Sequence, residues 1–240
     1  MIEIKDLTFH YSNSSDIISS LSLDISENSC VAIIGESGCG KTTLLNLIAG
    51  IITPNKGFVR KKTDDISYLM QYVTLLPYKT ALENALLAYE LRNKCVDKNI
   101  EKKAKELLAL FRMGEDSFLK FPGELSGGMK QRIGLVQTLL TSSDLVLLDE
   151  PFNAIDVNAL ETIENYIWRY TKEERRTMVF ITHNIEQALL LSDWVVIMGN
   201  NQAIQYVIPD KEYVELPPSQ RIKKQEYKSL FYEIMERMKL

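Results

Sequence analysis

The sequence has few of the residues that build metal sites or disulfide frameworks. Its 240 residues include only three cysteines and two histidines. Cys30, Cys39 and Cys95 form no CxxC pair, so we expect neither a structural zinc site nor a disulfide framework, but a reducing compartment. The 28 lysines and arginines against 32 aspartates and glutamates give a net charge of −4. This balance argues against a general nucleic-acid binder.

Long apolar runs are missing as well. No stretch approaches the roughly 18 residues that a membrane-spanning helix needs. The first residues, MIEIKDLTFHY, alternate apolar and polar side chains and do not resemble a signal peptide. Hydrophobic residues still make up 45% of the chain, which is enough for a sizeable core. We therefore expect a protein that is soluble by itself and has a membrane role only through a partner.

Apolar segments with strand character alternate with helical patterns along most of the chain. Strands are expected at residues 2–11, 21–25, 30–35, 145–150, 177–182 and 194–198, and helices at 41–50, 159–174 and 184–192. Several of these strands are continuous apolar runs, as expected of strands covered on both faces. The alternation predicts an α/β fold with a mainly parallel sheet. Helical patterns at residues 81–140 interrupt it, so we interpret that region as an inserted subdomain.

The segment GESGCGKT, residues 35–42, matches the phosphate-binding pattern G-x-x-x-x-G-K-S/T in full. It follows an expected strand and opens an expected helix. Its glycines permit a tight backbone path, so that N–H groups can face a phosphate at the positive end of the helix. Lys41 would reach the β- and γ-phosphates, and Thr42 would ligate Mg²⁺. The alternative is a glycine turn that merely caps a structural helix. The residues predicted to bind nucleotide here are Gly35, Ser37, Gly38, Cys39, Gly40, Lys41, Thr42 and Thr43.

Two carboxylates follow another expected strand, in LVLLDEPFNAID. The carboxyl ends of strands are where open α/β sheets bind ligands. Asp149 suits a Mg²⁺ contact, and Glu150 could polarise a water aimed at the γ-phosphate. His183 ends the next apolar strand and could bond that phosphate or hold Glu150 and the water. Taken alone, these residues could also simply end strands and cap turns.

With these motifs in this order, the chain resembles the ATP-binding subunits of ABC transporters. The resemblance covers about residues 2–198 and rests on GESGCGKT, LSGGMKQR (residues 125–132), LVLLDE (residues 145–150) and His183. It implies a P-loop NTPase core with an N-terminal antiparallel β subdomain and an inserted α-helical subdomain. The single domain would comprise a core at 1–70 and 141–210, a helical subdomain at 71–140 and a helical tail at 211–240.

The resemblance also implies roles for individual residues. Catalytic roles fall to Lys41, Glu150 and His183, and Mg²⁺ contacts to Thr42, Gln71 and Asp149. Nucleotide contacts beyond the phosphate loop fall to Tyr11, Gln71, Ser126, Gly127, Gly128, Asp149 and Asp156. Tyr11 would stack on adenine, Gln71 would sense the γ-phosphate, and Asp156 would lie in the loop that follows the acidic strand.

In the family that the chain resembles, two ATPase subunits pack head to tail with each ATP between them. This implies that Ser126, Gly127 and Gly128 touch a phosphate held by a second copy of the chain. A hydroxyl and N–H groups at a helix start form an anion site, which makes the reading physically reasonable. A capped helix with a Gly-Gly hinge is the alternative, but it does not explain both glycines. Gln131 and Arg132 are interpreted as structural.

The segment after Gln71, VTLLPYKTALENA, resembles the LLPW…ENV pattern of nitrate, sulfonate and taurine importers. Tyr78 replaces the tryptophan of that pattern. The resemblance implies transmembrane permease subunits and, indirectly, a solute-binding protein as partners, no nucleic acid, and a peripheral position on the cytoplasmic face of the cell membrane. The region of residues 75–91 would receive a short helix from each permease subunit.

Other functions remain open at this point. One is the ATPase of an exporter or lipoprotein-release complex, which also uses an LLP…EN stretch. Another is a soluble ATPase of DNA repair or the ribosome, although such proteins carry long coiled coils or tandem domains that this chain lacks. A nucleotide kinase would share the phosphate loop but not LSGGMKQR.

Overall fold

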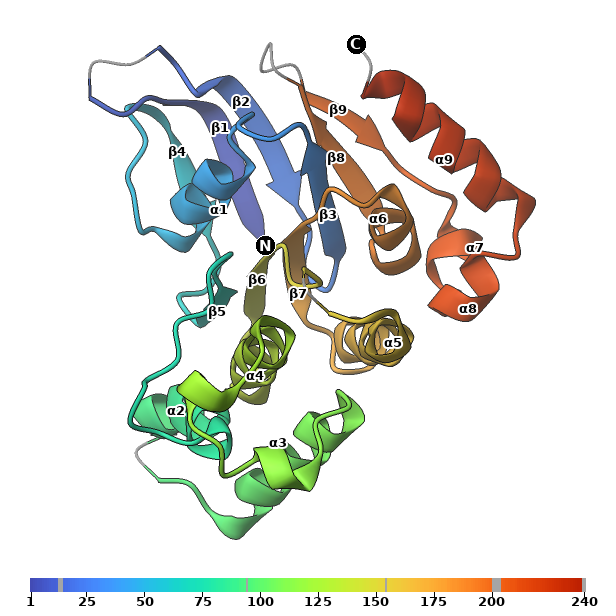
Figure 1. Ribbon diagram of the computed structural model, residues 1–240. Coiled ribbons are helices and arrows are strands. Elements are labelled where there is room, and N and C mark those ends of the chain that lie inside the picture. Colours follow the sequence, from blue (N-terminus) through green and yellow to red (C-terminus); the bar gives the residue numbers. More distant parts are fainter. Residues whose placement is uncertain (13–14, 94, 154, 200–203, 239–240) are drawn as a thin grey trace.

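The computed structural model describes residues 1–12, 15–93, 95–153, 155–199 and 204–238, and it contains two sheets. The smaller sheet is antiparallel with strand order β2-β1-β4. Its strands are β1 (Ile2–Phe9), β2 (Ile18–Ile25) and β4 (Lys56–Lys61). The expected N-terminal antiparallel subdomain is therefore confirmed (Figure 1).

The larger sheet has six strands in the order β5-β6-β7-β3-β8-β9. The first five are parallel, and β9 pairs antiparallel with β8. They are β3 (Cys30–Gly35), β5 (Ile66–Leu69), β6 (Leu145–Asp149), β7 (Thr177–Ile181), β8 (Trp194–Met198) and β9 (Ile204–Val207). The mainly parallel sheet is confirmed, and its carboxyl edge gathers the ends of β5, β6, β7 and β3.

The helices fall into three groups. The core helices are α1 (Lys41–Ala49), α5 (Val157–Glu173) and α6 (Ile185–Leu191), and the inserted helices are α2 (Ala81–Asn93), α3 (Lys98–Leu110) and α4 (Gly127–Leu140). The tail holds α7 (Lys211–Val214), α8 (Pro218–Arg221) and α9 (Gln225–Arg237). Two short 3-10 helices, Glu115–Ser117 and Pro122–Glu124, precede α4. Figure 1 shows α2 and α3 at the end of the molecule remote from the small sheet. Among the described residues, no helix combines the length and the apolar character needed to cross a bilayer.

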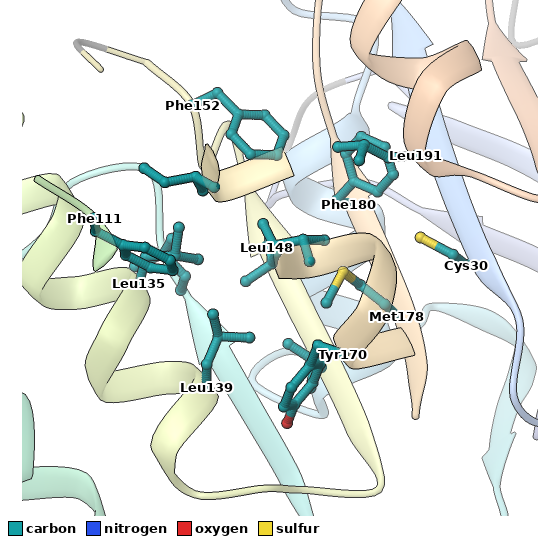
Figure 2. Close-up of a cluster of buried hydrophobic side chains, with 14 of the residues drawn as sticks. Cys30, Phe111, Leu135, Leu139, Leu148, Phe152, Tyr170, Met178, Phe180 and Leu191 are labelled. Atoms are coloured by element: carbon teal, nitrogen blue, oxygen red, sulfur yellow. The ribbon is translucent and has the colours of Figure 1, made fainter. Parts of the chain in front are cut away.

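Alternate residues of the central strands enter two different cores. In β3, Cys30, Ala32 and Ile34 face the helical cluster that includes residues of α4, α5 and α6. Val31 and Ile33 join the other cluster, with the small sheet and α1. Figure 2 shows the first cluster, where Leu148 and Met178 of neighbouring strands lie between Leu135 of α4 and Cys30 of β3. Both faces of the sheet are covered, which explains the continuous apolar runs in the sequence.

Several element boundaries differ from the expectations. The first strand ends at Phe9 rather than at Tyr11, and the second begins at Ile18. The helical pattern after residue 81 is two helices, because Asp97 starts α3 by accepting hydrogen bonds from Asn99 N and Ile100 N at 2.8 and 2.9 Å. Strands β4, β5 and β9 were not predicted: β4 is largely exposed, and β5 and β9 have only four residues each.

Candidate nucleotide-binding and hydrolysis site

The glycine-rich loop between β3 and α1 has a backbone path that only glycine permits at two positions. Gly35 has a φ of 152°, and a Cβ there would lie 2.2 Å from Met198 O. Gly40 caps α1 with a φ of 101°, and a Cβ there would lie 3.0 Å from Ile17 Cγ2. The loop therefore closes tightly over the start of α1, as a phosphate-binding loop requires.

Lys41 lies inside this loop and is 8% exposed. Its Nζ donates hydrogen bonds to Gly35 O at 2.9 Å and to Glu36 O at 2.7 Å, and it lies 3.8 Å from Cys39 Sγ. The two carbonyls thus hold the ammonium group at the centre of the loop. A charge at this point is suited to phosphate oxygens, which accept the same hydrogen bonds more strongly than carbonyls do.

Thr42 and Asp149 join the phosphate loop to the end of β6. Thr42 Oγ1 donates a hydrogen bond to Asp149 Oδ2 at 2.7 Å. Asp149 is 1% exposed, and its Oδ1 is buried without a hydrogen-bond partner among the described residues. Burial raises the pKa of this carboxyl group, opposed by the Thr42 hydrogen bond. A hydroxyl and a carboxylate with a free oxygen are the hard oxygen ligands that Mg²⁺ prefers, so these residues fit that ion.

Glu150 follows Asp149 in a strained conformation, with a φ of 50°. Its Oε1 lies 3.9 Å from His183 Nδ1, and its Oε2 accepts a hydrogen bond from Asn153 Nδ2. Gln131 Nε2 donates to Glu150 O at 3.3 Å, so the start of α4 holds this turn. The contacts from Asn153 and Gln131 were not predicted, although the position of Asn153 in the turn after β6 could have indicated the first.

The signature residues, Ser126, Gly127 and Gly128 of the LSGGMKQR segment, lie at the start of α4. Ser126 caps this helix, and its Oγ accepts a hydrogen bond from Met129 N at 3.2 Å. Gly127 is exposed, and a Cβ added to it would meet no atom within 4 Å. Neither a positive φ nor a steric contact within the described chain requires glycine at this position.

Three other predicted residues lie outside this cluster of contacts. Gln71 follows β5 at the same carboxyl edge as Asp149, but its side chain is exposed. Asp156 caps α5 by accepting from Ala159 N at 3.0 Å, and it pairs with Arg132, which together hold its pKa below the usual range. Tyr11 is 48% exposed and packs edge-on against Phe9, with ring centroids 4.9 Å apart.

The structure thus brings the phosphate loop, Asp149, Glu150 and His183 to one sheet edge. Asp149 pairs with Ile181 in the register of β6 and β7, and Thr182 N donates to Ile33 O of β3 at 3.2 Å. The ends of β6 and β7 therefore present two carboxylates and an imidazole beside the phosphate loop, which follows β3 and holds the ammonium group of Lys41. Such a set can bind a phosphate chain and a hard cation, and can accept a proton beside them.

Comparison with known proteins identifies a matching family and several relatives. The family described as ABC transporter matches residues 18–153. The formylaminopyrimidine import ATP-binding protein ThiZ of Halalkalibacterium halodurans is 37% identical over 229 residues, covering 93% of this chain and 87% of the relative. The carnitine transport ATP-binding protein OpuCA of Listeria monocytogenes is 34% identical over 223 residues, covering 88% of this chain. The chain spans only 56% of the length of that relative.

Two further similarities bear on the substrate and the assembly. The nitrate import ATP-binding protein NrtC of Synechococcus elongatus is 38% identical over 196 residues, covering 77% of this chain and 29% of the relative. Among solved structures, the dimeric structure of MJ0796, a bacterial ABC transporter cassette, superposes with a TM-score of 0.77 at 26% identity, covering 87% of this chain and 98% of that one.

Proposed function

Because this chain belongs to the ABC transporter family, whose cassettes are ATP-binding ATPases, we propose that it hydrolyses ATP to power a membrane transporter. The observation that carries the proposal is the junction of Thr42 with Asp149, which ties the phosphate loop to the acidic strand end at 2.7 Å. ATP is the substrate of the proposed reaction, and a transported solute is moved by the partner subunits.

Each predicted site residue near this junction has a proposed role in binding or hydrolysing ATP. The loop N–H groups and Lys41 bind the phosphates. Thr42, Asp149 and Gln71 would hold Mg²⁺, which when bound neutralises charge on the phosphate oxygens. Glu150 Oε1 accepts a proton from the attacking water, and His183, 3.9 Å away, orients that carboxylate. Tyr11 is proposed as the surface on which adenine stacks.

We propose that the working unit is a head-to-tail dimer of this chain. Ser126 and Gly127 are exposed and Gly128 is half-buried at the start of α4, where a phosphate held by a partner copy could reach their donors. The open space around Gly127 supports this assignment, because among the described residues no neighbouring atom requires a residue without a Cβ there. The dimeric form of a similar cassette supports it as well.

The proposed transporter is an importer of a small solute, with the ATPase bound to permease subunits at the cytoplasmic face of the membrane. The names of ThiZ, OpuCA and NrtC all refer to transport or import of small solutes. The narrower proposal of a nitrate, sulfonate or taurine importer rests on the segment after Gln71 and on NrtC alone. A solute-binding protein would act upstream of the permease. No observation favours the exporter alternative over this assignment.

The test of the ATPase assignment is Glu150→Gln. Removing the carboxylate that accepts the proton should leave ATP binding intact and lower turnover by at least about a hundredfold. An ATP-bound dimer should then accumulate, detectable by size-exclusion chromatography with ATP. Glu186→Gln, an exposed carboxylate at the start of α6, is the matched control and should keep near-normal turnover. Near-normal hydrolysis by Glu150→Gln would refute Glu150 as the base.

A further inference from the structure

A groove of about 470 Å³ lies between the inserted helix α3 and the core helix α5, apart from the nucleotide site. Positions 103, 106, 107 and 110 of α3 line one wall, and positions 166, 169, 170 and 173 of α5 line the other. Each set has the spacing i, i+3, i+4, i+7, so one complete helix face meets another across the groove. The two helices lie next to each other in Figure 1. A space of this size suits a small molecule.

The floor of the groove is apolar and aromatic. Leu107 is buried and Leu110 is half-buried on the α3 side. Tyr166 and Tyr170 stack on the α5 side, with ring centroids 6.2 Å apart and an angle of 29° between the rings. Phe111 contacts Tyr166 edge-on, with ring centroids 5.6 Å apart. This surface would accept an apolar side chain with little rearrangement.

The rim of the groove carries charges of both signs. Lys103 and Arg169 are its cations, and neither forms an ion pair in the described part of the chain. Glu106, Glu173 and Glu174 are its carboxylates. Three carboxylates against two cations give the rim a net negative charge, which would repel a nucleotide or another polyanion. A ligand that carries one charge of each sign matches this rim best.

Tyr170 gives an independent sign of a ligand. Its side chain is 2% exposed, and its hydroxyl is buried with no hydrogen-bond partner among the described residues. Tyr170 itself lines the groove, and burial, followed by the charge of Glu174, raises the pKa of its hydroxyl. In Figure 2 the hydroxyl points away from the apolar side chains around Leu148. A buried hydroxyl without a partner is costly, and a polar ligand group could satisfy it after a small movement.

From the groove, its charged rim and the unpartnered hydroxyl, we infer that this site binds a free amino acid with an apolar side chain. The apolar side chain packs on Leu107, Leu110 and the two tyrosine rings. The carboxylate lies between Lys103 and Arg169, and the ammonium group faces the rim glutamates. The site is separate from the proposed ATPase chemistry and does not depend on it.

A ligand bound in the groove would contact both the inserted helix α3 and the core helix α5 and so hold them together. Arg132 of α4 already joins the same two helices near one end. Its guanidinium donates to Phe111 O and Arg112 O, both at 3.3 Å, and pairs with Asp156 at the start of α5. A ligand that contacts both walls adds a second connection between α3 and α5. We therefore expect binding to raise the unfolding temperature of the chain.

The experiment uses the full chain without nucleotide and four matched probes. L-phenylalanine has both charges and an apolar body. 2-Phenylethylamine lacks the carboxylate, 3-phenylpropanoate lacks the ammonium group, and L-alanine lacks the apolar body. Isothermal titration calorimetry should show that L-phenylalanine binds at least about tenfold more tightly than each of the others, because each lacks one contact class. Equal binding of the four probes, equal binding of either singly charged probe, or no binding of L-phenylalanine overturns the inference.

Three variants localise the binding. Arg169→Gln and Tyr170→Phe should each weaken L-phenylalanine binding by about tenfold, because one removes a cation and the other a hydroxyl. Lys105→Gln removes a cation of α3 that does not line the groove, and its affinity should equal that of the parent chain. The circular dichroism spectrum of each variant checks its fold, and Arg169 is exposed, so its variant should fold normally. Unchanged affinity in Arg169→Gln, or equal loss in Lys105→Gln, overturns the assignment.

Discussion

Glu164 of α5 is a buried carboxyl group whose charge is costly to the fold. It is 8% exposed, and neighbouring Glu161 and Glu186 carry like charges. Glu186 accepts a hydrogen bond from Tyr227 of α9 at 3.2 Å, so these acids lie where the C-terminal helix packs on the core. Burial, and then the two glutamates, raise the pKa of Glu164 to about 7 from an ordinary value of 4.5.

This pKa predicts a specific pH dependence of stability. The folded chain holds the Glu164 proton more tightly than the unfolded chain, so its contribution to stability falls as the pH rises from about 4.5 to about 7. Glu164→Gln should therefore raise the free energy of unfolding at pH 8. The change it causes at pH 8 should exceed the change it causes at pH 4.5 by on the order of 3 kcal/mol. Urea unfolding of both chains at the two pH values measures the difference.

The control for this prediction is Glu236→Gln, which changes an exposed carboxylate of α9. Its effect on the free energy of unfolding should be small and nearly the same at both pH values. A Glu164→Gln effect of equal size at pH 4.5 and pH 8 would show that packing, rather than charge, dominates at this residue.

At the scale of elements, α4 connects the signature residues to the segment that follows Gln71. A Cβ on Gly134 of α4 would lie 2.7 Å from Val73 Cγ1 and 3.0 Å from Leu69 Cδ1. Glycine therefore lets α4 lie directly against the end of β5 and the residues beyond it. The helix that begins with Gly127 thus contacts the chain two residues after Gln71, so packed residues join two proposed nucleotide contacts.

Two glycine substitutions in α4 should have opposite consequences. Gly134→Ala forces Val73 and Leu69 to move, so we expect a loss of about 1–3 kcal/mol in the free energy of unfolding. In Gly127→Ala the added Cβ meets no atom of the described residues within 4 Å, so the substitution should change stability by no more than about 0.5 kcal/mol. Its ATPase activity should nevertheless fall, because the partner's phosphate would approach this backbone. Urea unfolding and steady-state hydrolysis of the two variants separate the effects.

The opposite pattern would contradict this account. A stable, fully active Gly127→Ala chain would remove the proposed contact across the dimer, and an unchanged free energy of unfolding for Gly134→Ala would mean that α4 shifts away from Val73 without cost.

The sequence predicts the elements and contacts that depend on local pattern. β3 and β6 are continuous apolar runs, and the phosphate loop has its whole motif within residues 35–42. β5 was not predicted because its four residues become a strand only by pairing with β6. The contact of Gln131 with the Glu150 turn depends on how α4 packs against the strand end, across 19 residues of chain. The local sequence pattern does not predict a contact between residues so far apart in the chain.

At the scale of the whole molecule, one chain presents two complementary halves of a site. The phosphate loop and acidic edge hold Lys41 at a buried position, while the start of α4 exposes Ser126 and Gly127. If two chains pair head to tail, each half meets the other half on the partner, and both sites are complete. A variant defective in one half should therefore be complemented by a variant defective in the other half.

Mixing Lys41→Ala with Ser126→Arg tests this pairing. Lys41→Ala removes the loop cation, and Ser126→Arg blocks the exposed helix start, so each variant alone should lack both ATP occlusion and turnover. Random pairing makes about half the dimers mixed, each with one intact site, so the mixture should regain about a quarter of the parental ATP sites. Trapped radiolabelled ATP counts those sites even where coupling between the two suppresses hydrolysis. A mixture of Lys41→Ala with Lys41→Ala,Ser126→Arg has no intact site and serves as the control. Failure of the first mixture to retain ATP above this control would mean that Ser126 acts within its own chain or not at all.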